Sequence, residues 1–166
     1  MKFDIARQPL VPAFMTLFAL AVAAMCAGIP VPDTETSGAV REALPLLGGQ
    51  LARFQAAYPV WSKFAAGFML LFAGMCTGRI SIRYNLYTVG TCLPIPLYAI
   101  VACGIATGGN YLAGFAASML LALATKNYCR AFCNGYGFDA IFRASLYLGL
   151  MPLIYAPALP LLLLLP

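Results

Sequence analysis

Long apolar runs alternate with short polar connectors along this chain of 166 residues. A helix of about 20 apolar residues crosses the hydrocarbon core of a bilayer. Five runs approach or reach that length, and they cover residues 10–31, 60–77, 86–105, 111–125 and 144–166. The pattern predicts an all-α fold, a polytopic transmembrane helix bundle of about five spans that forms one integral membrane domain over residues 1–166.

The connector at residues 32–59 is the longest polar segment and carries an amphipathic pattern. Its apolar residues recur at alternating steps of four and three, which places them on one face of a helix; they are Val40, Leu44, Leu47, Leu51 and Phe54. Pro45 and the pair Gly48-Gly49 predict a break in that helix. We therefore expect a broken amphipathic segment in the membrane interface, or alternatively a loop packed over the bundle.

Prolines in the third run, and residues near the two ends of the chain, lead to further predictions for three of the spans. Pro94 and Pro96 lack N–H donors and lie in the middle of the third run, so they predict a kink or break there. The last run ends in LLLLLP without an aromatic or basic anchor, which favours a chain truncated at its C-terminus. Lys2 and Arg7 precede the first run as in a secretory signal peptide. That run is long enough to span, which favours an uncleaved helix and leaves the signal peptide as the alternative.

The composition indicates that the bilayer is the solvent for most of the chain. Hydrophobic residues make up 63% and charged residues 9%, whereas a soluble domain carries about 25% charged residues. The net charge of +5 is dispersed, so it reads as a topology signal and not as a nucleic-acid-binding surface.

The sequence offers little catalytic chemistry. The chain has no histidine, the commonest general base and metal ligand. Its six cysteines form no CxxC pair, and Cys129 and Cys133 are the only close pair. No ionisable residue lies in the middle of a span, and no phosphate-loop, HExxH or nucleophile-elbow motif occurs. We therefore expect no catalytic residues, no metal, no cofactor and no nucleic-acid partner.

The basic residues predict the orientation of the spans. Cytoplasmic loops are enriched in Lys and Arg. With the N-terminus inside, seven basic residues are cytoplasmic and three are outside: Lys2, Arg7, Arg79, Arg83, Lys126, Arg130 and Arg143, against Arg41, Arg53 and Lys63. The expected location is the inner (plasma) membrane, with five passes, a cytoplasmic N-terminus and an outside C-terminus.

Small residues at four-residue spacing predict sites of close helix packing. Such residues let two helix backbones approach in a membrane. The pattern occurs at Gly74 and Gly78, at Gly104 and Gly108, and at Gly114 and Ser118. Packing within the bundle is the favoured interpretation, and a face for a homo-oligomer or another membrane-protein partner is the alternative.

The most polar inside-facing segment is the predicted loop at residues 126–143. Its basic residues and those of the preceding inside connector form a set that can bind the headgroup of an anionic membrane lipid or a lipid-linked phosphate; the set is Arg79, Arg83, Lys126, Arg130 and Arg143. Asp139 and Arg143 are four residues apart and are expected to pair on one helical turn. The alternative is that these charges only set topology.

Three runs in the C-terminal part of the chain share a pattern with a known family: RYNLYTVGTCLPIPLYAIVACGI, YLAGFAASMLLALATKNYCRAF and FDAIFRASLYLGLMPLIYAPALPLLLLLP. With these runs, residues 66–166 resemble an uncharacterised family of bacterial multi-pass inner-membrane proteins. The last run matches a pattern GLxxLxYxPAxxLLLL at Gly149-Leu150, Tyr155, Pro157-Ala158 and Leu161–Leu165. The family is about twice as long, so the resemblance implies that this chain is the N-terminal part. It implies no catalytic residues.

Two hypotheses for function follow from the sequence. The first is a non-enzymatic integral inner-membrane protein, structural or accessory in the bacterial cell envelope. The alternative is a fragment of a transporter or of an enzyme acting on a lipid-linked substrate, with its active residues in a missing C-terminal part.

Overall fold

The computed structural model describes residues 10–26, 46–84, 92–106, 111–134 and 137–164, and every regular element in these ranges is helical. This confirms the all-α prediction for the described part of the chain. The elements are α1 (Leu10–Cys26), α3 (Leu46–Ala57), α4 (Pro59–Arg83), α5 (Pro94–Ala106), α6 (Tyr111–Asn134), α7 (Gly137–Ile154) and a 3-10 helix η1 (Ala156–Leu164).

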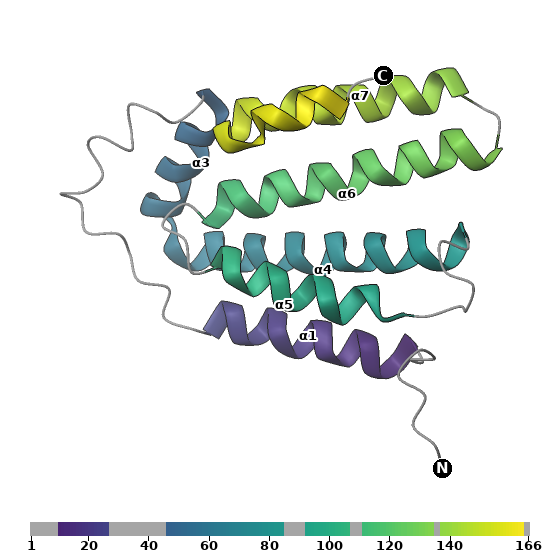
Figure 1. The fold of residues 1–166 in the computed structure, drawn as a ribbon. Coiled ribbons are helices and arrows are strands. Elements are labelled where there is room, and N and C mark those ends of the chain that lie inside the picture. Colours follow the sequence, from purple (N-terminus) through teal and green to yellow (C-terminus); the bar gives the residue numbers. More distant parts are fainter. Residues whose placement is uncertain (1–9, 27–45, 85–91, 107–110, 135–136, 165–166) are drawn as a thin grey trace, which may run out of the picture.

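Five α-helices lie side by side, and α3 crosses one end of them (Figure 1). Helix α7 packs on α6, α6 packs on α4, and α1, α4 and α5 all contact one another. Helices α4 and α6 run in one direction, and α1, α5 and α7 run in the opposite direction. We call the end crossed by α3 the α3 end. We call the other end, where α4 and α6 finish and α7 begins, the basic end.

Helix α4 is longer than the apolar run that predicts it. It begins with Pro59 at its first position, where a missing N–H costs nothing. It continues to Arg83, and the N–H of Tyr84 donates to the carbonyl of Ile80 at 3.1 Å. The connector predicted from residue 78 onward is therefore helical as far as Arg83. The reason is that Ile80 and Ser81 are buried, so packing extends the helix past the apolar run.

Helix α5 begins at Pro94, which corrects the predicted kink in the middle of a span. Pro94 and Pro96 occupy its first turn, where N–H groups have no intrahelical acceptor. The N–H of Ile95 donates to the carbonyl of Cys92 at 3.0 Å, and the N–H of Leu97 donates to that of Leu93 at 3.3 Å. The two prolines therefore start this helix. Residues 86–91 of the predicted span lie outside the described ranges.

The described residues of the loop predicted at residues 126–143 are all helical, and residues 135–136 lie outside the described ranges. Helix α6 runs through the basic segment to Asn134, and α7 begins at Gly137. Lysine and arginine are good helix formers, so the change from apolar to polar residues at position 126 does not end the helix.

The predicted span at residues 144–166 is not a single helix. Helix α7 ends at Ile154, and the 3-10 helix η1 turns back along it (Figure 1). Pro157 and Pro160 have no N–H to continue an α-helical ladder. Ala158 packs with Leu148 and Met151 of α7, which holds the returned segment in place.

Helix α3 is unbroken from Leu46 to Ala57, so the predicted break at Gly48-Gly49 is wrong. The helix contacts α4, α6 and α7. The side-chain oxygen of Gln55 accepts a hydrogen bond from the N–H of Leu112 at 3.4 Å. This tertiary packing offsets the low helix propensity of two glycines. Val40, Leu44 and Pro45 of the predicted amphipathic segment lie outside the described ranges.

The interior of the bundle is built mainly from alanine. Between α1, α4, α5 and α6 the fully buried large side chains are few, and they pack among alanines: Leu17, Leu70, Ile95, Leu112 and Phe115. A second cluster joins α6, α7 and η1 through Ala117, Ala124, Leu148, Met151 and Ala158. Small side chains allow the helix backbones to lie close together.

Candidate functional site

A buried hydrogen bond aligns α4 with α6. The hydroxyls of Ser62 and Tyr111 share this hydrogen bond, and both residues are buried. Lys126 follows Tyr111 by fifteen positions, so it lies about level with Thr77 of α4, since both helices rise about 1.5 Å per residue. The register therefore brings Lys126 beside the C-terminal turns of α4.

A pocket of about 650 Å³ lies at this place. Arg79 and Arg83 reach it from α4, and Lys126 reaches it from α6. The rest of its lining is mostly apolar and comes from α1, α4, α5 and the residue after α4: Leu10, Phe72, Met75, Cys76, Ile80, Ile82, Tyr84 and Ile95. The pocket thus combines three cations with a hydrocarbon wall.

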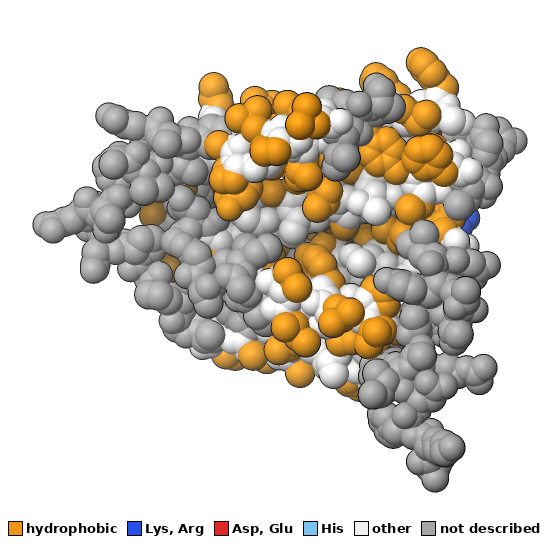
Figure 2. Space-filling model, viewed as in Figure 1, with side chains coloured by type: hydrophobic (Ala, Val, Ile, Leu, Met, Phe, Trp, Pro, Cys, Tyr) orange, Lys and Arg blue, Asp and Glu red, His pale blue; other side chains and the backbone are white. Residues whose placement is uncertain are grey.

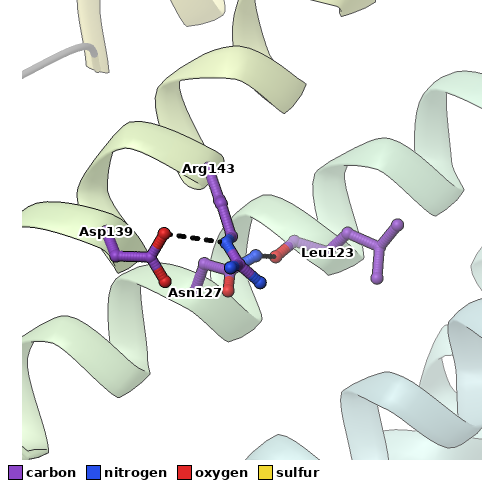
Figure 3. A network of polar contacts seen from close by, with 4 residues as sticks. All are labelled: Leu123, Asn127, Asp139 and Arg143. Carbon is purple, nitrogen blue, oxygen red and sulfur yellow. Dashed lines mark hydrogen bonds and ion pairs between the residues drawn. The ribbon is translucent and has the colours of Figure 1, made fainter.

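The other two residues of the predicted cationic set lie outside the pocket lining. Arg130 is exposed on α6. The Nε of Arg143 donates to Oδ1 of Asp139 at 3.1 Å, and both side chains are more than half exposed. Figure 3 shows Arg143 extending from α7 toward Asn127 of α6, whose amide donates to the carbonyl of Leu123 at 3.0 Å. The structure therefore brings together three members of the set.

Asp139 is the only carboxylate side chain among the described residues. Its described ion-pair partner is Arg143 on its own helix. Within the described ranges, no carboxylate lines the pocket beside Arg79, Arg83 and Lys126. Within the described residues, an anion bound there would meet positive charge that no carboxylate compensates.

Two of the predicted packing glycines lie on the face of α4 that meets α1 and α5. A Cβ at Gly74 would lie 2.8 Å from Cδ1 of Leu17 and 3.2 Å from Cδ1 of Tyr98. A Cβ at Gly78 would overlap the side chain of Ile95. Both glycines are thus places where a neighbouring side chain contacts the backbone of α4.

The remaining predicted packing residues that the structure describes lie on α5 and α6. Gly114 is partly buried on α6. Ser118 shares a 3.1 Å hydrogen bond with the hydroxyl of Tyr98 and also donates to the carbonyl of Phe115. Gly104 belongs to α5, but its packing is not described, and Gly108 lies outside the described ranges.

Sequence reasoning missed two features of this packing face. Gly67 lies against Met25 of α1, and its spacing of seven residues from Gly74 was the available signal. Ser81 is buried at the basic end of α4, and its hydroxyl has no hydrogen-bond partner within the described structure. No sequence pattern marks such a hydroxyl, because its isolation depends on how the neighbouring helices pack.

Among the described residues, no three His, Cys, Asp or Glu side chains gather as metal ligands. Among the described cysteines, Cys76 is the one that lines the pocket.

By length and composition, α4 and α7 are long and apolar enough to cross a membrane, and α1 is a shorter apolar helix. Together, the fold and the pocket define an all-helical bundle with an amphiphilic pocket at one end. Comparison of the chain with protein-family models, with curated proteins and with solved structures gives no match. The resemblance to an inner-membrane family therefore stays a prediction.

Proposed function

We propose that this chain is a multi-pass integral protein of the inner (plasma) membrane, with a cytoplasmic N-terminus and a structural or accessory role in the cell envelope. The proposal places α1, α4, α5, α6 and α7 across the bilayer. It places α3 at the outer surface and the basic end at the cytoplasmic surface.

The observation that carries this proposal is the distribution of side-chain size. Alanine and glycine fill the interior, while the outward faces carry large apolar side chains, such as Val101 at 72% exposed, Trp61 at 69% and Phe68 at 67%. On the face shown in Figure 2, hydrophobic side chains are spread over the described surface, and Lys or Arg colour is visible there only near one edge. A soluble monomer rarely exposes so extensive an apolar surface. In lipid, large apolar residues face the acyl chains and small residues mediate helix contacts.

The charges of α4 fit the thickness of a bilayer. Lys63 and Arg79 are sixteen positions apart with no charged residue between them, which corresponds to about 24 Å of helix. Lysine and arginine side chains can extend toward the headgroups, so this length is compatible with a hydrocarbon core of about 30 Å.

The alternating directions of the five helices support the orientation. Helix α1 would run outward, α4 inward, α5 outward, α6 inward and α7 outward. Arg79, Arg83, Lys126, Arg130 and Arg143 then gather on the cytoplasmic side, as the positive-inside rule requires. Leu17 of α1 is fully buried in the core, which favours a retained first helix over a cleaved signal peptide.

Membrane extraction and reporter insertions test the proposal. The full chain should stay with the membranes through an alkaline carbonate wash. Alkaline phosphatase inserted between residues 32 and 45 should be active, and green fluorescent protein inserted between residues 85 and 91 should fluoresce. Release by carbonate would contradict membrane integration. Reporters active on the reversed sides would contradict only the orientation.

A second candidate function is lipid handling, either as a transporter or as part of an enzyme that acts on a lipid-linked substrate. The pocket at the basic end favours it, because its cations and apolar wall match a charged amphiphile. The described residues provide no histidine or carboxylate beside the pocket cations, so binding is the part of this function that the pocket supports best.

A further inference from the structure

We propose that the pocket at the basic end binds one anionic phospholipid, with the lipid phosphate held by Arg79, Arg83 and Lys126. Its acyl chain lies along the apolar wall. This inference rests on the membrane location proposed above, because only a bundle in a bilayer has lipid available to enter the pocket from the side.

The three cations form a site for one phosphate. Arg79 and Arg83 are four positions apart on α4, which places them on one helical face. Lys126 faces the same pocket from α6. Like charges at one pocket repel each other, and a bound anion removes that cost. Guanidinium groups bind phosphate oxygens through two parallel hydrogen bonds, and lysine adds a third charge-assisted contact.

The apolar wall selects a lipid over a free phosphate. Phe72 and Met75 line the pocket on the turns of α4 that precede Arg79. Leu10 of α1 and Ile95 of α5 complete the apolar part of the wall. A volume of about 650 Å³ is within the range of small-molecule sites. A soluble phosphate leaves this wall in contact with water, whereas an acyl chain covers it.

The order of the residues along α4 matches the order of groups in a phospholipid. Phe72 lies eleven positions before Arg83, a separation of about 16 Å along the helix. On α4, Phe72 and Met75 therefore lie deeper than Arg79 and Arg83. Lys126 of α6 lies about level with Thr77, between these apolar side chains and the two arginines. A lipid of the cytoplasmic leaflet has its groups in the same order, with the acyl chain toward the bilayer centre and the phosphate at the surface.

The inference is tested by native mass spectrometry of the full chain purified in a neutral detergent. The probes are phosphatidylglycerol and phosphatidylcholine with identical acyl chains. We expect phosphatidylglycerol to bind at least tenfold more tightly. Arg79→Gln and Lys126→Gln should each weaken its binding about tenfold, which corresponds to about 1.4 kcal/mol. Arg53→Gln, the same change on the exposed surface of α3, should alter the affinity less than twofold.

Two further arms separate a lipid site from simpler explanations. Inorganic phosphate should fail to displace phosphatidylglycerol at equal concentration, and Arg130→Gln should have a much smaller effect than Arg79→Gln. Displacement by inorganic phosphate would overturn the lipid assignment. An equal effect of Arg130→Gln would indicate a diffuse basic surface and would overturn the pocket.

Equal binding of the two lipids by a chain that resists carbonate extraction would refute this inference and leave the membrane proposal standing. Release of the chain by carbonate would refute the membrane proposal itself. Circular dichroism of each variant verifies that its helical content is unchanged. Arg79 and Lys126 are exposed and lie on different helices, so two independent variants probe the same site.

Discussion

At Gly78 the backbone of α4 meets the side chain of Ile95 on α5. Ile95 is almost fully buried and branched at its Cβ, so it has little freedom to move aside. A glycine is therefore needed here because of the close approach of a neighbouring side chain. Sequence spacing predicts that Gly74 and Gly78 lie on a packing face. It does not identify their partners, because Leu17 and Ile95 come from two other helices.

An alanine scan of two glycines separates close packing from helix propensity. Gly78→Ala should destabilise the bundle by about 1–3 kcal/mol, because the new methyl group overlaps a side chain that is held in place. Gly149→Ala, the same change on α7, meets no atom within 4 Å. It should stabilise the bundle by about 0.5–1 kcal/mol through helix propensity. Thermal unfolding in detergent measures both effects, and a stabilising Gly78→Ala would contradict the close contact.

At the scale of the helix, hydropathy located the apolar runs better than it located the helix ends. Predicted spans stop where the residues become polar, but α6 continues from Lys126 to Asn134 as a helix. The reason is that polar residues can extend a helix into water or headgroups without changing its backbone. Residue types that favour turns mark these two helix ends, since α6 ends at Asn134 and α7 begins at Gly137.

The prolines likewise left the helix ends undetermined. Pro94 and Pro96 are compatible with a kink or with a helix start, and the difference depends on where the chain enters the bundle. Ile95, between them, is buried in the core, which fixes the start of α5 at this point. A single sequence carries no information about that contact.

Helix α1 is predicted to be a structural part of the bundle. Leu17→Ala should destabilise the protein by about 2–5 kcal/mol, because it leaves a cavity against Leu70 and Gly74. Met15→Ala, on the exposed face of the same helix at 59% exposed, should have a much smaller effect. Both variants are compared by thermal unfolding in detergent. Equal, small effects would indicate a first helix that contributes nothing to the core.

At the scale of the molecule, the pocket combines three of the five basic residues that the sequence groups together with apolar residues that it does not single out. Arg79, Arg83 and Lys126 are recognisable as basic residues of two connectors that the sequence predicts on the same side of a membrane. Leu10 and Ile95 are unremarkable members of apolar runs, and they join the pocket only because α1 and α5 pack against α4. Arg143 lies outside the pocket lining, on α7, where it pairs with Asp139 as the four-residue spacing predicted.

The distribution of exposed apolar residues also predicts how charge is tolerated on the outside of the bundle. Phe68 and Val60 are similarly exposed on α4, at 67% and 63%. Phe68 lies five positions past Lys63, toward the middle of the uncharged stretch, whereas Val60 lies at the α3 end. An arginine near the centre of a membrane helix costs about 2.5–3.5 kcal/mol, and one at its end extends to the headgroups at little cost.

Phe68→Arg should therefore sharply reduce the amount of protein recovered in carbonate-washed membranes, while Val60→Arg should leave it nearly unchanged. In a water-soluble bundle both arginines would face water, and both would be tolerated alike. Equal recovery of the two variants at the wild-type level would thus show that lipid does not surround this face of α4. Phe68 and Val60 are eight residues apart, which corresponds to about 12 Å along the helix. A loss confined to Phe68→Arg therefore requires surroundings that exclude a charge at Phe68 and accept one at Val60. A bilayer has that property and water does not.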